Sequence, residues 1–142
     1  MRVHDVLRRK GANVVTVRPE ATVRELLDML AEHRIGALVV SSDGKAVEGI
    51  VSERDIVLRL HDRGPEILDA NVVEIMTVDV STCRPDELLE NLMALMTNQR
   101  FRHVPVVAEG ALVGIISIGD VVKHRMDELQ AERDQLVGYI SR

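Results

Sequence analysis

The sequence predicts an α/β (α+β) fold in which two tandem β-α-β-β-α units pack as one domain with pseudo-twofold symmetry. Three observations lead to this prediction. The chain has 142 residues, 46% of them hydrophobic, which is enough for one compact domain with a proper core. The second half aligns with the first half, and each half shows the same order of strand and helix patterns.

The internal repeat keeps its register over most of the chain. Val14 aligns with Val80, and in the same register Gly44 aligns with Gly110. A one-residue deletion in the second copy then shifts the register once, and the matched pairs that follow include Gly49 with Gly114, Ser52 with Ser117, and Asp55 with Asp120. Chance seldom keeps so many matches in register, so each half is predicted to contain the same elements.

The first copy begins with a short strand at residues 14–17, which Arg18-Pro19 connects to a helix. Thr22 and Glu25 form a T-x-x-E capping box at the start of this helix. The apolar residues that follow have the spacing of one helical face, and they are Val23, Leu26, Leu27 and Leu30. The second copy repeats this face at the aligned positions Leu89, Leu92, Met93 and Met96.

Two apolar strands come next in the first copy, at residues 36–41 and 47–51, with an Asp-Gly turn between them. A second helix is predicted from about Glu53, with Ile56, Val57 and Leu60 on its buried side. Because one copy has a sheet face that its own helices leave uncovered, the two copies are expected to pack together.

The predicted boundaries follow from the repeat and from the Gly64-Pro65 pair, which ends the preceding helix. A short helix at residues 72–76 leads into the second copy, much as residues 3–7 lead into the first. The predicted segments are 1–13 for the N-terminal helix and lead-in, 14–63 for repeat 1, 64–79 for the linker and short helix, 80–125 for repeat 2, and 126–142 for a C-terminal helical extension.

The C-terminal extension carries an a/d-like apolar stripe that Arg133 interrupts. Its members are Met126, Leu129, Leu136 and Ile140. This helix either packs back on its own domain or forms a contact with a second copy of the chain. An exposed apolar stripe favours the homodimer.

Composition excludes several classes of function. The net charge of -5 and the presence of only two aromatic residues, Phe101 and Tyr139, argue against binding of nucleic acid. The first ten residues lack the apolar segment of a signal peptide, and no apolar run is long enough to span a membrane. The expectation is therefore a cytoplasmic protein without a membrane partner. The single cysteine, Cys83, is expected to be a buried core thiol.

Both copies contain the motif G-x-x-S-x-x-D where the last strand meets the last helix: Gly49, Ser52 and Asp55 in the first, and Gly114, Ser117 and Asp120 in the second. Glycine lets a ligand approach the backbone, and a serine at a helix start offers donors to a phosphate. An ionised aspartate can accept hydrogen bonds from both ribose hydroxyls.

The same serine and aspartate also fit a capping box, which needs no ligand. For one copy alone the cap is the better interpretation. The occurrence in both copies, each time with the glycine at the same place before the serine, favours ligand binding.

The repeated β-α-β-β-α unit with G-x-x-[ST]-x-x-D resembles the CBS-domain family, and two units in tandem resemble a Bateman module. The resemblance covers residues 3–125, and residues 101–107 and 35–40 look like the middle strands of second and first repeats. It implies two clefts between the repeats that hold an adenosine ligand.

The resemblance assigns residues to each cleft. One cleft would use Ser117 and Asp120 with Val15, Thr16, Gly36, Ala37 and Leu38. The other would use Ser52, Arg54 and Asp55 with Ser81, Thr82, Arg102, His103 and Val104. In both, backbone groups and aliphatic side chains rather than aromatic rings would hold the adenine.

The two clefts differ in their predicted charge. Arg54, Arg102 and His103 give the first-motif cleft enough positive charge for a di- or triphosphate. The second motif has Ile118 and Gly119 where the first has Glu53 and Arg54. One site is therefore expected to bind more tightly, or to prefer a smaller ligand.

The remaining histidines show no spacing typical of metal ligands, and His4, His33, His61 and His124 are expected on the solvated surface. Functional and structural roles are equally open for His103.

The predicted function is a non-catalytic regulatory sensor that binds AMP, ADP, ATP or NAD(H), or else S-adenosylmethionine, and signals to an unknown effector protein. No obligatory cofactor and no metal are expected. The alternative is an interaction or dimerisation scaffold with vestigial clefts. An enzyme is disfavoured, because the sequence contains no nucleophile paired with a base, no metal-carboxylate cluster and no Walker loop.

Overall fold

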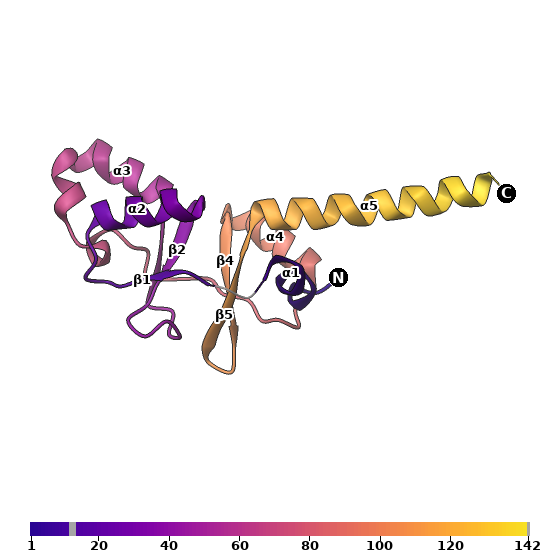
Figure 1. Cartoon of the computed structure of the whole chain (residues 1–142), viewed down its shortest axis with the longest axis horizontal. Coiled ribbons are helices and arrows are strands. Elements are labelled where there is room, and N and C mark those ends of the chain that lie inside the picture. Colours follow the sequence, from indigo (N-terminus) through magenta and orange to yellow (C-terminus); the bar gives the residue numbers. More distant parts are fainter. Residues whose placement is uncertain (12–13, 142) are drawn as a thin grey trace.

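The chain forms two successive β-α-β-β-α units, and the structure, a computed structural model, describes residues 1–11 and 14–141. Residues 12 and 13 of the predicted lead-in and residue 142 of the predicted extension lie outside the described residues. The first half contains α1 (Val3–Lys10), β1 (Thr16–Val17), α2 (Val23–His33), β2 (Ala37–Val40), β3 (Gly49–Ser52), α3 (Glu53–Arg63) and the 3-10 turn η1 (Pro65–Asp69). The second half contains η2 (Val72–Glu74), α4 (Leu89–Gln99), β4 (His103–Ala108), β5 (Ala111–Ser117) and α5 (Ile118–Ile140), as Figure 1 shows.

Each half builds a small sheet from the predicted strands. β1 and β2 are parallel, β2 and β3 are antiparallel, and the register sets Ala37 opposite Ser52. β4 and β5 form the equivalent antiparallel pair, in which His103 lies opposite Ser117. The entry strand of the second copy is reduced to one parallel bridge between Cys83 and Val106. The middle strand of each repeat thus lies beside the motif of its own repeat.

The polar residues at the helix starts explain where the helices begin. Thr22 caps α2 with Glu25 in the predicted capping box. Ser52 and Ser117 cap α3 and α5 in the same way, each by accepting a hydrogen bond from the backbone N–H of the motif aspartate. α2 and α4 both end at an arginine in the left-handed conformation, Arg34 at φ 54° and Arg100 at φ 59°.

The molecule has two hydrophobic cores, and each contains a segment from the other half. Val3 and Val6 of α1 are fully buried in the core of the second repeat, beside residues such as Leu92. Val72 and Ile75 are equally buried in the core of the first repeat. The lead-in segments are therefore exchanged: each precedes one repeat in sequence and packs on the other.

Backbone hydrogen bonds repeat this exchange with pseudo-twofold symmetry. The Val72 N–H donates to the Ala21 carbonyl at 2.7 Å, and the Val3 N–H donates to the Glu87 carbonyl at 2.9 Å. The donors Val3 and Val72 occupy equivalent positions when the two lead-ins are aligned. The acceptors Ala21 and Glu87 occupy equivalent positions when the two repeats are aligned. These contacts hold the two repeats together as one module.

The predicted buried side of the second helix is wrong for two of its three residues. Ile56 is 3% exposed, but Val57 is 63% exposed and Leu60 is 37% exposed. The helical spacing identifies an apolar face, and within this chain only the Ile56 part of it is covered. The rest of the face remains at the surface of α3.

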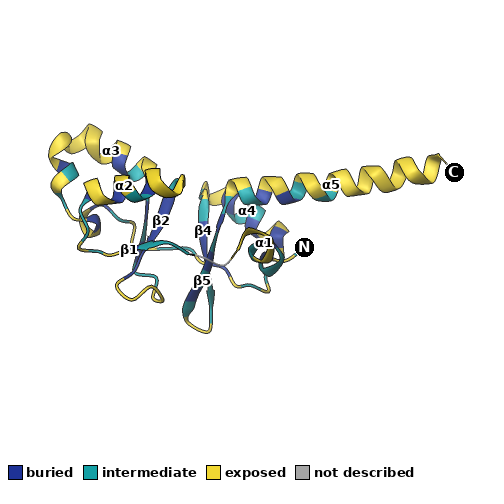
Figure 2. Cartoon of the chain, viewed as in Figure 1, coloured by how far each residue is buried: buried dark blue, intermediate teal, exposed yellow. Residues whose placement is uncertain are grey.

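α5 continues far beyond the module, as the sequence predicted (Figure 1). Figure 2 shows that its C-terminal half is exposed on all sides. The predicted stripe is part of this exposed surface, with Met126 64%, Leu129 47%, Leu136 63% and Ile140 80% exposed. The C-terminal half of α5 therefore does not fold back on its own domain.

Candidate functional site

The first motif forms a capped helix start at the junction of β3 and α3. The Ser52 N–H and hydroxyl donate to Asp55 Oδ2 at 2.8 and 3.0 Å, and the Asp55 N–H donates to Ser52 Oγ at 3.4 Å. Among the described residues, Asp55 Oδ1 has no hydrogen-bond donor. The capping box is thus present, and it leaves one carboxylate oxygen available to a ligand.

The second motif has the same capping geometry at the junction of β5 and α5. The Ser117 N–H donates to Asp120 Oδ2 at 2.9 Å, and the Asp120 N–H donates to Ser117 Oγ at 3.1 Å. An additional group is present here: Lys10 Nζ lies 2.6 Å from Asp120 Oδ2 and 2.9 Å from the Ile115 carbonyl oxygen. Burial raises the pKa of Asp120, but the hydrogen bonds from Lys10 and Ser117 outweigh it and lower the pKa below 3.8.

A cavity of about 600 Å³ lies at the first motif, between the two repeats. Repeat 1 contributes its middle strand and its motif: Gly36, Ala37, Ile50, Ser52, Glu53, Arg54, Asp55 and Val57. The linker and repeat 2 contribute Thr77, Asp79, Val80, Ser81, Arg100, Phe101, Arg102 and His103. The volume is in the range of small-molecule sites.

The structure brings together most of the residues predicted for the first-motif cleft. Ser52, Arg54, Asp55, Ser81, Arg102 and His103 line this one cavity. Thr82 does not, because it faces a different pocket on the outside of repeat 2. Val104 is fully buried in the core and is not part of the lining.

The predicted grouping of the other cleft needs a correction. Gly36 and Ala37 line the cavity of Ser52 rather than joining Ser117, because β2 pairs with β3 of its own repeat. Leu38 is 1% exposed and belongs to the core. Thr16 of β1 pairs with Val39 of β2, and Val15 packs against the first core. Neither residue lines the cavity at Ser52.

The two motif glycines have a different role from the one predicted. A Cβ on Gly49 would lie 2.7 Å from Met76 Sδ and 3.0 Å from the Thr77 carbonyl oxygen. A Cβ on Gly114 would overlap the side chain of Leu7. Each glycine thus leaves room for the lead-in segment that precedes the other repeat. This close contact, rather than a ligand, explains why the position is a glycine.

Sequence reasoning missed Lys10 and Asp79. Lys10 belongs to the first lead-in and Asp120 to the last helix, so no local motif connects them. Alignment of the two lead-ins, with Val3 opposite Val72, would have made Lys10 and Asp79 equivalent. That alignment shows one lysine and one aspartate at corresponding positions near the two motifs.

The charges around the cavity are mixed. Arg54, Arg100 and Arg102 face it together with Glu53, Asp55 and Asp79. The pKa of His103 lies below its usual 6.5, because burial and then the Lys10 ammonium disfavour the charged ring. His103 is therefore mostly neutral at neutral pH, and the positive charge that lines this cavity comes from the arginines.

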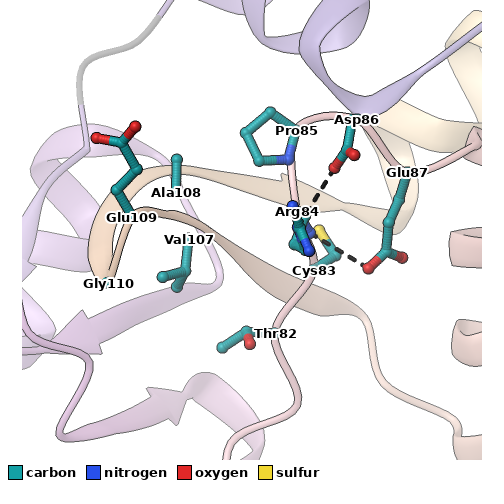
Figure 3. A pocket seen from close by; sticks show the side chains of 10 residues that line it. All are labelled: Thr82, Cys83, Arg84, Pro85, Asp86, Glu87, Val107, Ala108, Glu109 and Gly110. Carbon is teal, nitrogen blue, oxygen red and sulfur yellow. Dashed lines mark hydrogen bonds and ion pairs between the residues drawn. The ribbon is translucent and has the colours of Figure 1, made fainter.

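A second pocket, shown in Figure 3, lies between the entry segment of repeat 2 and the tip of the β4–β5 hairpin. Its polar groups pair with one another: Arg84 Nε lies 3.4 Å from Asp86, and the Arg84 N–H donates to Glu87 at 3.4 Å. The same Arg-Pro-acid turn occurs in repeat 1, where Arg18 pairs with Glu20. The pocket therefore lies at the turn that enters α4.

Two predictions about single side chains have opposite outcomes. Cys83 is 2% exposed in the second core, as predicted, and burial raises the pKa of its thiol to about 12. His124 was expected at the surface but is 5% exposed on α5, where Nδ1 lies 2.8 Å from the Asp120 carbonyl oxygen. Its helical position, one turn after Asp120, turns it inward.

Neither a metal site nor a membrane span is found in the described part of the chain. None of its His, Cys, Asp and Glu side chains form a group of three that could hold a metal ion. None of its helices combines the length and the apolar character needed to cross a bilayer.

Comparison with known proteins gives a family and several structural neighbours. The family model described as CBS domain matches residues 3–62 and 72–127. The crystal structure of the CBS-domain containing protein ATU1752 from Agrobacterium tumefaciens is similar with a TM-score of 0.85 and 47% identity, over 88% of this chain and 99% of that one.

Two further neighbours contain adenosine compounds. The CBS domain protein PAE2072 from Pyrobaculum aerophilum, complexed with AMP, matches with a TM-score of 0.75 and 31% identity, over 84% of this chain and 89% of that one. The CBS domain pair of protein MJ0100, in complex with 5'-methylthioadenosine and S-adenosyl-L-methionine, matches with a TM-score of 0.79 and 25% identity, over 90% of this chain and 98% of that one.

Proposed function

The chain belongs to the CBS-domain family, with two repeats that form one Bateman module, and we propose that it is a non-catalytic sensor of an adenosine nucleotide. The observation that carries the proposal is the cavity of about 600 Å³ that both repeats line and that contains Ser52 and Asp55. Neighbours that hold AMP, or S-adenosylmethionine and 5'-methylthioadenosine, support the ligand class.

The chemistry of the cavity fits the parts of such a ligand. Asp55 Oδ1 can accept a hydrogen bond from a ribose hydroxyl, while Oδ2 continues to cap α3. Arg54, Arg100 and Arg102 can bind a phosphate, and Ile50 and Val80 offer an apolar surface to the base. Because both repeats contact one ligand, binding favours one relative geometry of the repeats, which an effector protein can recognise.

Isothermal calorimetry with AMP, ADP, ATP, NAD, NADH and S-adenosylmethionine tests the proposal. We expect saturable binding of at least one compound, and at least a tenfold loss in Asp55→Ala, because the ribose loses a charged acceptor. Glu25→Ala is the matched control, since it removes the equivalent capping carboxylate of α2, which does not line the cavity.

The competing function is an interaction scaffold whose clefts bind nothing. The capping boxes of α3 and α5 explain the serine and aspartate of both motifs without any ligand. If folded, ligand-free protein binds none of the six compounds, the scaffold is the correct function. Turnover of a bound nucleotide would instead contradict the non-catalytic assignment.

The proposal also includes a homodimer and a cytoplasmic location. Val122 and Met126 are exposed apolar residues on α5, and Val57 is an exposed apolar residue on α3. Such a surface is typical of a contact between protein chains. Fractionation of cells that express the full-length protein tests the location.

A further inference from the structure

His103 is a titratable side chain at the place where the two repeats meet. It is the first residue of β4, and it lines the cavity of about 600 Å³ that contains Ser52 and Asp55. A Cβ on Gly36 would lie 3.5 Å from His103 Cε1 and 3.7 Å from the carboxyl carbon of Glu53. The imidazole of repeat 2 and a carboxylate of repeat 1 therefore approach the same glycine at the cavity.

The ring nitrogens of His103 are available to a ligand. Among the residues that the structure describes, no group forms a hydrogen bond with them, and neither nitrogen is fully buried. The neutral ring offers one donor nitrogen, whereas the protonated ring offers two donors and a positive charge. An ionised phosphate oxygen only accepts hydrogen bonds, so a phosphate in this cavity interacts better with the protonated ring.

The fixed charges around the ring are of both signs and nearly balance. Burial is the largest influence and holds the pKa of His103 below its usual 6.5. The ammonium of Lys10 on α1 and the guanidinium of Arg102 act in the same direction, whereas the carboxylates of Asp120 on α5 and Glu53 on α3 oppose them. The other charged groups that line the cavity also include both signs, and they are Arg54, Asp55, Asp79 and Arg100. A charge that a ligand brings into the cavity can therefore decide whether the ring is protonated.

We propose that His103 takes up a proton from solvent when a phosphate-bearing ligand binds in this cavity, so that the module responds to pH as well as to the nucleotide. The proposal rests on the proposed function, since it adds a regulation to the same cavity. The three arginines of the lining are the groups that favour a phosphate there, and the ring lies on the same lining.

The direction of the pH dependence follows from the two states of the ring. In the free chain the ring is mostly neutral at neutral pH, because its pKa is lowered. A bound phosphate stabilises the charged ring and raises the pKa of His103, so the chain takes up a proton on binding at any pH between the free and bound values. The affinity is then highest below the free-state pKa and falls as the pH rises through the bound-state pKa. Adenosine carries no charge and leaves the ring neutral.

The direct test is an NMR titration of the His103 ring in the full wild-type chain, free and saturated with AMP, ADP, ATP or adenosine. The Cε1–H resonance is followed over the range of histidine ionisation, and the phosphorus resonance of the ligand gives the ionisation of the phosphate separately. We expect the phosphate compounds that bind to raise the pKa of His103 by about one pH unit or more. Adenosine should leave it unchanged.

Calorimetry of His103→Asn is the second measurement. The ratio of affinities at acidic and mildly basic pH should be larger in the wild-type chain than in this variant, by about threefold or more for the same phosphate compound. The ionisation of the phosphate is common to both chains and cancels in the comparison. His61→Asn is the matched control, because His61 lies on α3 with an exposed ring and does not line the cavity. This control should keep the wild-type ratio.

The outcomes separate this proposal from the proposed function. A phosphate compound that binds in the cavity without raising the pKa of His103 overturns the proton uptake and leaves the sensor supported. Binding of S-adenosylmethionine alone has the same two consequences. A pH dependence that is equal in His103→Asn and in the wild-type chain also overturns the role of His103. Binding of none of the compounds overturns both proposals.

Discussion

At the scale of single residues, Gly49 and Gly114 decide how closely the lead-ins pack on the sheets. Each glycine adjoins a side chain of the exchanged lead-in, Met76 in one half and Leu7 in the other. We expect Gly49→Ala and Gly114→Ala each to lower the free energy of unfolding by about 1–3 kcal/mol, because the added methyl group overpacks the contact. Urea denaturation measures the change.

Gly138→Ala is the control for these substitutions, since a Cβ there has open space and lies in a helix, where alanine is favoured. Combining Gly114→Ala with Leu7→Ala should cost less than the sum of the two single changes, because the methyl group then fills the space that leucine leaves. Strict additivity would show that the two residues do not contact each other.

The thiol of Cys83 is expected to be unreactive in the folded protein. Its pKa is raised to about 12 by burial, so almost no thiolate is present at neutral pH. Labelling with a thiol reagent should be slow in buffer and fast in denaturing urea. Fast labelling of the native protein would show that the second core opens without global unfolding.

The sequence predicts residue roles well where the partner is close in the chain. The capping boxes of Thr22, Ser52 and Ser117 each needed only one short local spacing. The Lys10–Asp120 ion pair and the contact of Leu7 with Gly114 join opposite ends of the chain. No local pattern contains such information, so the role of the glycines was predicted wrongly and Lys10 was missed.

At the scale of the elements, α5 is the helix whose surface most needs a partner. Residues 129–140 are exposed in the single chain, and an isolated helix of that length is only marginally stable in water. We expect the double substitution Leu129→Glu and Leu136→Glu to convert a dimer into a monomer in sedimentation equilibrium. The physical reason is the desolvation of two charges in an apolar contact.

The double substitution Gln130→Glu and Gln135→Glu is the control, since it adds the same charge to exposed polar positions of the same helix. A wild-type chain that sediments as a monomer, or a control that dissociates equally, would contradict the assignment of this stripe to the interface.

Helical periodicity predicted α2, α4 and α5 because their apolar positions recur on one face. It gave the wrong burial for Val57 and Leu60 because spacing identifies an apolar face but not the surface that covers it. The same limit applies to the stripe on α5, which the sequence identified as an apolar face without showing which surface covers it.

At the scale of the whole molecule, the exchanged lead-ins predict that both repeats unfold together. Val6→Ala removes packing from the second core and Ile75→Ala removes packing from the first. Each change should lower the stability of one single transition, by about 2–4 kcal/mol for the isoleucine. Circular dichroism and Cys83 labelling, followed against urea concentration, should give coincident curves.

Two separate transitions, or a Val6→Ala variant in which only one half unfolds early, would contradict this coupling. The internal repeat predicted the pseudo-twofold axis correctly. It could not predict the exchange, since the two lead-ins align equally well whether each packs on its own repeat or on the other.

The exchange of the lead-ins also relates this two-repeat chain to an assembly of two chains that each contain one repeat. A cut near residue 71 would leave two fragments, each holding an arm that completes the core of its counterpart. Two copies of a single unit with this geometry would form a domain-swapped dimer. The segment at residues 64–71 joins the two units covalently, so an assembly that would otherwise depend on protein concentration becomes intramolecular.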